Sequence, residues 1–159
     1  MCFKEFDEKT KYFMSEALLE AQKAYDRGET PIGAVVVCNG EIVGRGYNKV
    51  ETSNNPLNHA EMVAIEEACD KLGRWRLFDC EIYVTMEPCV MCAGAIVNSR
   101  IKKIYIGARH LKNHVVDKHN EFKREIYDDN KVIFEFGIMG EECSNILNEF
   151  FKKRRSEKK

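Results

Sequence analysis

Strand patterns and helix patterns alternate along this chain, and this alternation limits the possible folds more than any other feature. Residues 7–28 place aromatic and alanine side chains at helical spacing, and the pattern stops at Gly28. The apolar runs "IGAVVVC" and "EIVGRGY" are joined by Asn39-Gly40, a pair that supplies the positive φ angles of a tight hairpin. The first 47 residues therefore predict a helix followed by a β-hairpin.

The alternation continues to the end of the chain. Asn58 is a good cap for a helix from about His59 to Leu72, which ends at Gly73. The polar stretches 48–57 and 109–130 give no assigned regular structure. The further elements expected are the strand "EIYVT", a helix "PCVMCAGAIVNS" opened by Pro88, the strands "KKIYIGA" and "KVIFEFG", and a closing helix "EECSNILNEFFKKRR". Interleaved strands and helices predict a three-layer α/β/α sandwich.

The length of the chain favours one domain. With 159 residues, 44% of them hydrophobic, the chain can bury one core and is short for two. The sequence contains no internal repeat and no low-complexity linker. We therefore expect a single domain over residues 1–159, with a basic C-terminal tail at 152–159.

The net charge and the first residues of the chain indicate which partners and which cellular compartment to expect. A formal net charge of −1 gives no overall attraction to nucleic acid, so such binding needs a local patch. The end "FFKKRRSEKK" is either that patch or a solvated helix end. The first 14 residues contain no apolar run long enough for a signal peptide or a membrane span, which predicts a cytoplasmic protein without a membrane partner.

The seven cysteines fit a reducing compartment better than a disulfide framework, because their number is odd. Four of them lie within apolar or helical patterns and are expected in the core: Cys38, Cys69, Cys80 and Cys143. The remaining pair of interest is Cys89 and Cys92, three residues apart at the start of a predicted helix. A helix N-terminus favours thiolates, so this pair has the spacing and the environment of metal ligands.

His59 lies at the start of another predicted helix, with Glu61 two residues later. Each of these signals is modest alone, since a lone histidine or glutamate at a helix start is usually structural. Packed together, the two helix starts would present one histidine and two cysteines to one Zn²⁺ ion per chain. Three protein ligands leave the fourth tetrahedral position for water, which is the arrangement of a catalytic site. Glu61 could then accept a proton from that water without binding the metal.

His-x-Glu followed by Pro-Cys-x-x-Cys is the pattern of zinc-dependent nucleobase deaminases. The chain closely resembles the bacterial tRNA-specific adenosine deaminases in "ETPIGAVVV", "GRGYN", "HAEMVAI", "WRLFDCEIYVTMEPCVMCAGAIVNSRI" and "FFKKRR". The resemblance covers residues from about 8 to 109 and from about 137 to 155. It implies a cytidine-deaminase-like fold with a central mixed sheet of about five strands, a homodimer, and the conversion of adenosine to inosine at the wobble position of a tRNA anticodon loop.

The resemblance also implies roles for individual residues. His59, Cys89 and Cys92 match the zinc ligands, and Glu61 matches the proton shuttle. Other positions match substrate contacts: Asn48 for the nucleoside, Ile32 for the base, and Phe150, Phe151, Arg154 and Arg155 for the RNA loop. The alternatives are structural, since Asn48 could simply end the hairpin, the phenylalanines could pack in the core, and the arginines could be solvated.

Residues 109–130 depart from the family pattern, because "RHLKNHVVDKHNEFKREIYDDN" replaces a loop rich in lysine and glycine. His110, His114 and His119 are poorly spaced for a second metal site and are more typical of a solvated or nucleic-acid-facing loop. The departure keeps a second hypothesis open, a deaminase of free bases or nucleosides. "CVMCAGA" favours the tRNA enzymes. A zinc-binding or RNA-binding module without catalysis would have no need of Glu61.

Overall fold

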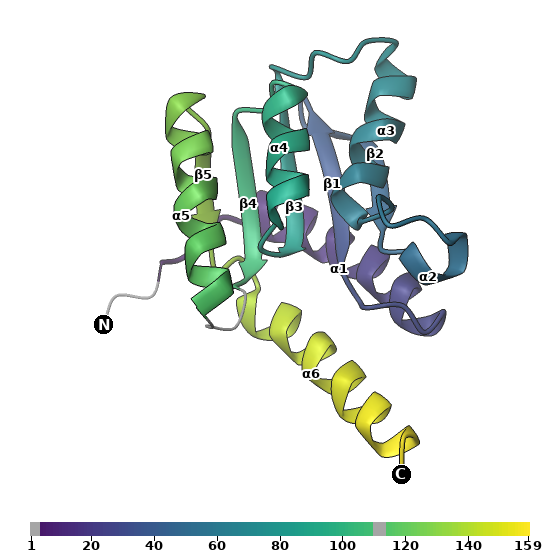
Figure 1. The fold of residues 1–159 in the computed structure, drawn as a ribbon. Helices are drawn as coiled ribbons and strands as arrows, with labels where there is room; N and C mark the ends of the chain where they lie inside the picture. Colours follow the sequence, from purple (N-terminus) through teal and green to yellow (C-terminus); the bar gives the residue numbers. More distant parts are fainter. Residues whose placement is uncertain (1–3, 110–113) are drawn as a thin grey trace.

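The computed structural model describes residues 4–109 and 114–159, with side chains described over 4–109 and 120–159. Within these residues a five-stranded sheet in the order β2-β1-β3-β4-β5 lies between two layers of helices (Figure 1). The strands are β1 Gly33–Cys38, β2 Glu41–Tyr47, β3 Cys80–Met86, β4 Lys103–Ala108 and β5 Ile133–Phe136. The helices are α1 Glu8–Asp26, α2 Val50–Ser53, α3 Ala60–Leu72, α4 Val90–Asn98, α5 His114–Asp129 and α6 Gly140–Glu157. This confirms the predicted three-layer sandwich.

The sheet is mixed, and its strand directions determine where the loops meet. β1 pairs antiparallel with both β2 and β3, whereas β3, β4 and β5 run parallel. Asn39 and Gly40 have φ angles of 50° and 80° and form the predicted hairpin turn between β1 and β2. Because β1 begins where β3 ends, residue 33 and residues 85–86 lie at the same edge of the sheet. The connection from β3 to α4 leaves from this edge.

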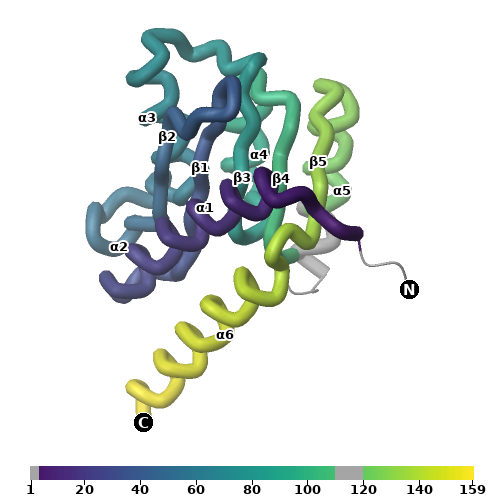
Figure 2. The backbone as a smooth tube through the Cα atoms, turned by 180° about the vertical axis from the view of Figure 1, so that it is seen from behind, coloured from purple at the N-terminus to yellow at the C-terminus, as the bar shows by residue number. Residues whose placement is uncertain are grey.

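The two faces of the sheet carry different helices. α3, α4 and α5 cover one face, and α1 with the start of α6 covers the other (Figures 1 and 2). α3 packs closely against β2, because Gly44 and Gly46 have no side chains to hold the helix away from the strand. A Cβ atom at either glycine would overlap the backbone of α3, at the carbonyl of Ala64 or of Ala60. The two glycines therefore fix the height of α3 above the sheet, and with it the position of its first turn.

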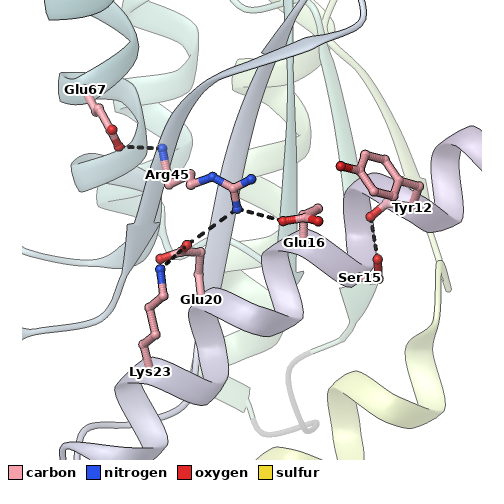
Figure 3. A network of polar contacts seen from close by, with 7 residues as sticks. All are labelled: Tyr12, Ser15, Glu16, Glu20, Lys23, Arg45 and Glu67. Atoms are coloured by element: carbon pink, nitrogen blue, oxygen red, sulfur yellow. Dashed lines mark hydrogen bonds and ion pairs between the residues drawn. The ribbon is translucent and has the colours of Figure 1, made fainter.

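Arg45 on the edge strand β2 connects the two helical layers (Figure 3). Its guanidinium contacts Glu16 of α1 at 2.8 Å and Glu20 at 3.6 Å, and its backbone N–H donates to Glu67 of α3 at 2.7 Å. Glu20 is almost fully buried and also pairs with Lys23 at 2.8 Å. A buried carboxylate needs such partners, so this network holds α1, β2 and α3 in one arrangement.

The structure corrects four details of the sequence analysis. His59, rather than Asn58, is the N-cap residue of α3. α4 begins at Val90, so Cys89 is its N-cap residue and Pro88 precedes the helix. The stretches 48–57 and 109–130, which gave no assigned structure, contain α2 and α5. Cys38, Cys80 and Cys143 are buried as expected, but Cys69 is only partly buried at the edge of the core.

Over the described residues, none of the helices has the length and apolar character needed to cross a membrane.

Candidate active site

The N-termini of α3 and α4 bring three possible metal ligands together. His59 and Cys89 are the N-cap residues of these helices, both with extended backbones, and neither side chain caps its own helix. Their side chains are therefore available to other partners. Cys92 lies in the first turn of α4 and is fully buried. The exposed N–H groups at the two helix N-termini favour negative charge at this point.

The geometry of the three side chains fits a zinc ion. Nδ1 of His59 lies 3.6 Å from Sγ of Cys89 and 3.6 Å from Sγ of Cys92, and all three donor atoms lie within 4.8 Å of one another. Around tetrahedral zinc, bonds of about 2.3 Å to sulfur and about 2.0 Å to nitrogen place these atoms about 3.5 Å apart. The sequence prediction of one histidine and two cysteines at one point is thus met by the fold.

The two thiols have opposite pKa shifts. A hydrogen bond from Cys92, together with the His59 imidazole, lowers the pKa of Cys89 to about 3. The same hydrogen bond and burial raise the pKa of Cys92. The Cys89 thiolate raises the pKa of His59 in turn. Cys89 therefore offers a thiolate at neutral pH, the form that binds metal.

Glu61 lies in the first turn of α3, beside the three ligands. Its side chain is buried and borders the same cavity as His59 and Cys89. Burial raises the pKa of this carboxyl above its usual value. A carboxyl in such surroundings can exchange protons with a group in the cavity, which is the requirement for general acid–base chemistry.

The cavity in front of these residues has a volume of about 330 Å³, within the range of small-molecule sites. Ile32 and Asn48, to which the resemblance assigns substrate contacts, both line it. Nδ2 of Asn48 donates to the buried carboxylate of Glu29 at 3.4 Å, and Glu29 also accepts from the backbone N–H of Thr52 at 2.6 Å. Glu29 thus orients the Asn48 amide. The sequence analysis missed Glu29, because an acidic residue between a helix end and a proline is an ordinary loop residue.

Of the C-terminal residues, the structure brings one arginine to the cavity. Arg154 lines it and donates from Nη2 to the carbonyl of Gly28 at 2.9 Å. Phe150 is buried against Tyr25, with ring centroids 5.8 Å apart. Phe151 is 44% exposed, and Arg155 is exposed as well; neither is among the residues that line the cavity. The four residues of the predicted RNA-binding cluster therefore have different surroundings. Arg154 lines the cavity, Phe150 is buried in the core, and Phe151 and Arg155 are exposed.

A buried lysine on α5 supports the loop that carries Cys89. Nζ of Lys123 donates to the carbonyl of Pro88 at 2.7 Å and lies 3.6 Å from Oε1 of Glu87. The side chain is only 4% exposed, and burial lowers its pKa. The sequence analysis missed Lys123, since no pattern distinguishes it among the many charges of 109–130. Of the histidines discussed there, His110 lies outside the described residues, as do the side chains of His114 and His119.

Residues 7–108 match the family described as the cytidine and deoxycytidylate deaminase zinc-binding region. The chain is 45% identical to the tRNA-specific adenosine deaminase of Streptococcus pyogenes serotype M1 over 152 residues, which span 96% of this chain and 89% of the relative.

Two solved structures extend the comparison. One comes from biochemical and structural studies of A-to-I editing by tRNA:A34 deaminases at the wobble position of transfer RNA; it is 37% identical, with a TM-score of 0.75, and covers 86% of this chain and 99% of its own. The other is guanine deaminase from Bacillus subtilis, 38% identical with a TM-score of 0.60, covering 77% of this chain and 76% of its own.

Proposed function

Because the chain belongs to the cytidine and deoxycytidylate deaminase zinc-binding family, we propose that it hydrolyses adenosine to inosine in RNA, at the wobble position of a tRNA anticodon loop. The observation that carries this proposal is the convergence of His59, Cys89 and Cys92 beside the buried Glu61. His59, Cys89 and Glu61 line a cavity that Arg154 also lines. The similarity to tRNA-specific adenosine deaminases extends over 96% of the chain, so it covers the metal ligands and reaches into α6.

His59, Cys89 and Cys92 would hold one zinc ion per chain, as their distances fit tetrahedral coordination. When bound, zinc supplies a water nucleophile at neutral pH by lowering the pKa of that water. The Cys89 thiolate and the α3 and α4 N-termini hold the ligand set at the end of the cavity. Three protein ligands leave one position for the water.

Glu61 is proposed to move the protons of the reaction. As the oxygen of water adds to C6 of adenine, the Glu61 carboxylate accepts one proton and delivers it to the ring nitrogen N1. It then transfers the remaining proton of the water to the amino group, the C6–N bond breaks, and ammonia leaves. Inosine keeps the oxygen. The position of Glu61 in the cavity wall, two residues from His59, supports this role.

Asn48 and Ile32 are proposed to hold the nucleoside. The amide of Asn48 is oriented by Glu29 and can hydrogen-bond with a polar group of the substrate. Ile32 offers an apolar surface on which a base can pack. An adenine in an anticodon loop is already largely unpaired, so it reaches the cavity at lower cost than one inside a duplex.

The end of α6 is proposed to contact the RNA beyond the target nucleotide. Arg154 at the cavity and the exposed Arg155 can pair with phosphates, and the exposed ring of Phe151 can stack on a base. All three residues lie on α6, the C-terminal helix (Figure 2). A free base or nucleoside would fill the cavity without reaching the outer residues.

Deamination of a free base is the second candidate, favoured by the 38% identity to guanine deaminase from Bacillus subtilis. A cavity of about 330 Å³ is large enough for a nucleobase alone. The 45% identity to a tRNA-specific enzyme over 96% of the chain favours the RNA substrate.

We also propose that residues 1–159 act as one domain in a cytoplasmic homodimer. The family resemblance implies the dimer, and α4 has partly exposed apolar side chains, among them Met91 and Ala95, on which a second copy could pack. Light scattering on the eluted peak of a sizing column measures the assembly. The proposal expects twice the mass of one chain, and a monomer would contradict it.

The substrate is tested by product analysis. The zinc-loaded protein is incubated separately with an anticodon stem-loop RNA that carries adenosine at the wobble position, the same RNA with guanosine there, free adenosine, guanine and cytosine. The proposal expects inosine in the first RNA and no comparable product in the other four. Rapid conversion of guanine with an unchanged RNA would establish the second candidate instead.

A further inference from the structure

A second cluster of sulfur and oxygen ligands lies at the opposite end of the sheet. Cys38 is the last residue of β1 and Cys80 is the first residue of β3, and the two are direct partners in the antiparallel ladder. Asp79 immediately precedes Cys80. The active-site loop follows the other end of β3, six residues and roughly 20 Å along the strand. The two clusters are therefore separate sites.

The distances within this cluster match a metal coordination sphere. Sγ of Cys38 lies 3.6 Å from Oδ2 of Asp79, and Sγ of Cys80 lies 3.7 Å from Oδ1. The three donor atoms all lie within 4.8 Å of one another. Bonds of about 2.3 Å to sulfur and about 2.0 Å to oxygen place such atoms about 3.5 Å apart around tetrahedral zinc.

Arg74 supplies the charge that a metal here would require. Its Nη2 atom lies 2.7 and 2.8 Å from the two oxygens of Asp79 and 4.0 Å from Sγ of Cys38. Two thiolates and one carboxylate carry three negative charges, which a divalent cation and one guanidinium balance. The two cysteines are buried, and buried thiols tolerate ionisation only when the charges are balanced in this way. Both Arg74 and Asp79 have side chains 33% exposed, so the cluster opens to solvent on their side.

We propose that Cys38, Asp79 and Cys80 form a second metal site for a thiophilic divalent cation such as Zn²⁺, with water as the fourth ligand. On binding, each thiol releases one proton and the sulfur donates an electron pair to the metal. Arg74 stays beside the coordinated carboxylate as the balancing charge. The metal joins the end of β1 to the connection before β3, across 41 residues of chain. Because it closes a long loop, its expected effect is on stability rather than on deamination.

The test counts metal ions and thiolate ligands in the reduced full-length protein. Wild type, Cys38→Ser and Asp79→Asn are saturated with Zn²⁺, dialysed and analysed for zinc. The matched control is Cys69→Ser, which removes a partly buried thiol that belongs to neither cluster. Both cluster variants should bind one ion fewer per chain than wild type, and the control should bind the same number. Equal zinc content in wild type and both cluster variants overturns the proposal.

Cobalt substitution gives a second readout that does not depend on activity. Sulfur-to-cobalt charge transfer reports thiolate ligands, so Cys38→Ser should reduce this absorption to roughly half if both sites are filled. Unchanged absorption in Cys38→Ser overturns the proposal. So does a Cys38–Cys80 disulfide that persists in excess reductant, detected by peptide mass spectrometry. The difference between wild type and Cys38→Ser stays readable even if the site at His59 fails to bind metal.

Discussion

The two ends of the sheet each gather two cysteines, but their surroundings differ. At one end, His59, Cys89 and Cys92 lie at helix N-termini beside the buried carboxyl of Glu61. His59, Cys89 and Glu61 line a cavity of about 330 Å³. At the other end, Cys38 and Cys80 lie on paired strands, and the neighbouring carboxylate is paired with Arg74. The first environment supplies a proton acceptor and space for a substrate. The second pairs its carboxylate with Arg74, so an ion there would stabilise the fold and have no part in deamination.

Serine in place of a ligand cysteine gives the largest expected difference between the two ends. Cys92→Ser removes a zinc ligand from the active site, so the variant should lose that zinc and all measurable inosine formation. Cys80→Ser makes the same chemical change at the other end of the sheet and should keep inosine formation near the wild-type rate. Zinc content and inosine yield are measured on both proteins. Inosine formation by Cys92→Ser protein that has lost the active-site zinc would rule out the proposed ligand set.

Truncation before Phe151 should give the next largest loss of deamination activity, and it should leave the cluster at Cys38 and Cys80 unchanged. It removes Arg154 from the cavity wall together with the exposed Phe151 and Arg155. Deamination of the stem-loop RNA should fall at least about tenfold, because phosphate and stacking contacts are lost. Raised salt should weaken RNA binding to the intact protein.

Circular dichroism and zinc content provide the controls for this truncation. If the intact protein deaminates free adenosine slowly, the same rate is measured on the truncated protein. That rate should be little changed, because a free nucleoside does not need the contacts made by α6. If the truncated protein is folded, holds its zinc and deaminates the stem-loop RNA at the wild-type rate, then α6 does not contribute to RNA recognition.

The site was more predictable from the sequence than the elements that support it. The sequence reveals the site because residue types that bind metal occur at fixed spacing at the starts of predicted helices. These residues are His59, Glu61, Cys89 and Cys92. Asn48 and Ile32 were placed by resemblance alone, and the fold brings both to the cavity wall. The start of α3 was wrong by one residue and that of α4 by two, which reflects how weakly sequence determines the ends of helices.

The supporting residues could not be predicted, because their roles depend on distant partners. Glu29 becomes a positioning group only when the fold brings it to Asn48, 19 residues away. Lys123 contacts Pro88 across 35 residues, from a helix whose charged sequence resembles a solvated loop. The cluster at Cys38 and Cys80 was read as core for the same reason, since only the strand register places Asp79 and two thiols together.

Lys123→Met should cause a smaller change, a loss of zinc affinity at the active site alone. The substitution keeps much of the side-chain length but removes the ammonium that holds the carbonyl before Cys89. The affinity of the active site for zinc should fall about tenfold, the lower end of what loss of a supporting contact costs. Competition with a chromophoric chelator measures this affinity. Lys123→Arg should restore part of it, and the zinc bound near Cys38 should be unaffected. Equal affinities in Lys123→Met and wild type would show that Lys123 only fills space.

The central claim is that Glu61 performs proton transfer and is not a metal ligand, and a paired measurement on Glu61→Ala tests it most directly. Zinc content and the single-turnover rate of inosine formation on the stem-loop RNA are determined on the same preparation. The account predicts wild-type zinc content, with a rate lower by about a hundredfold to ten-thousandfold, the usual contribution of general acid–base catalysis. A rate near that of wild type at full zinc content would contradict it.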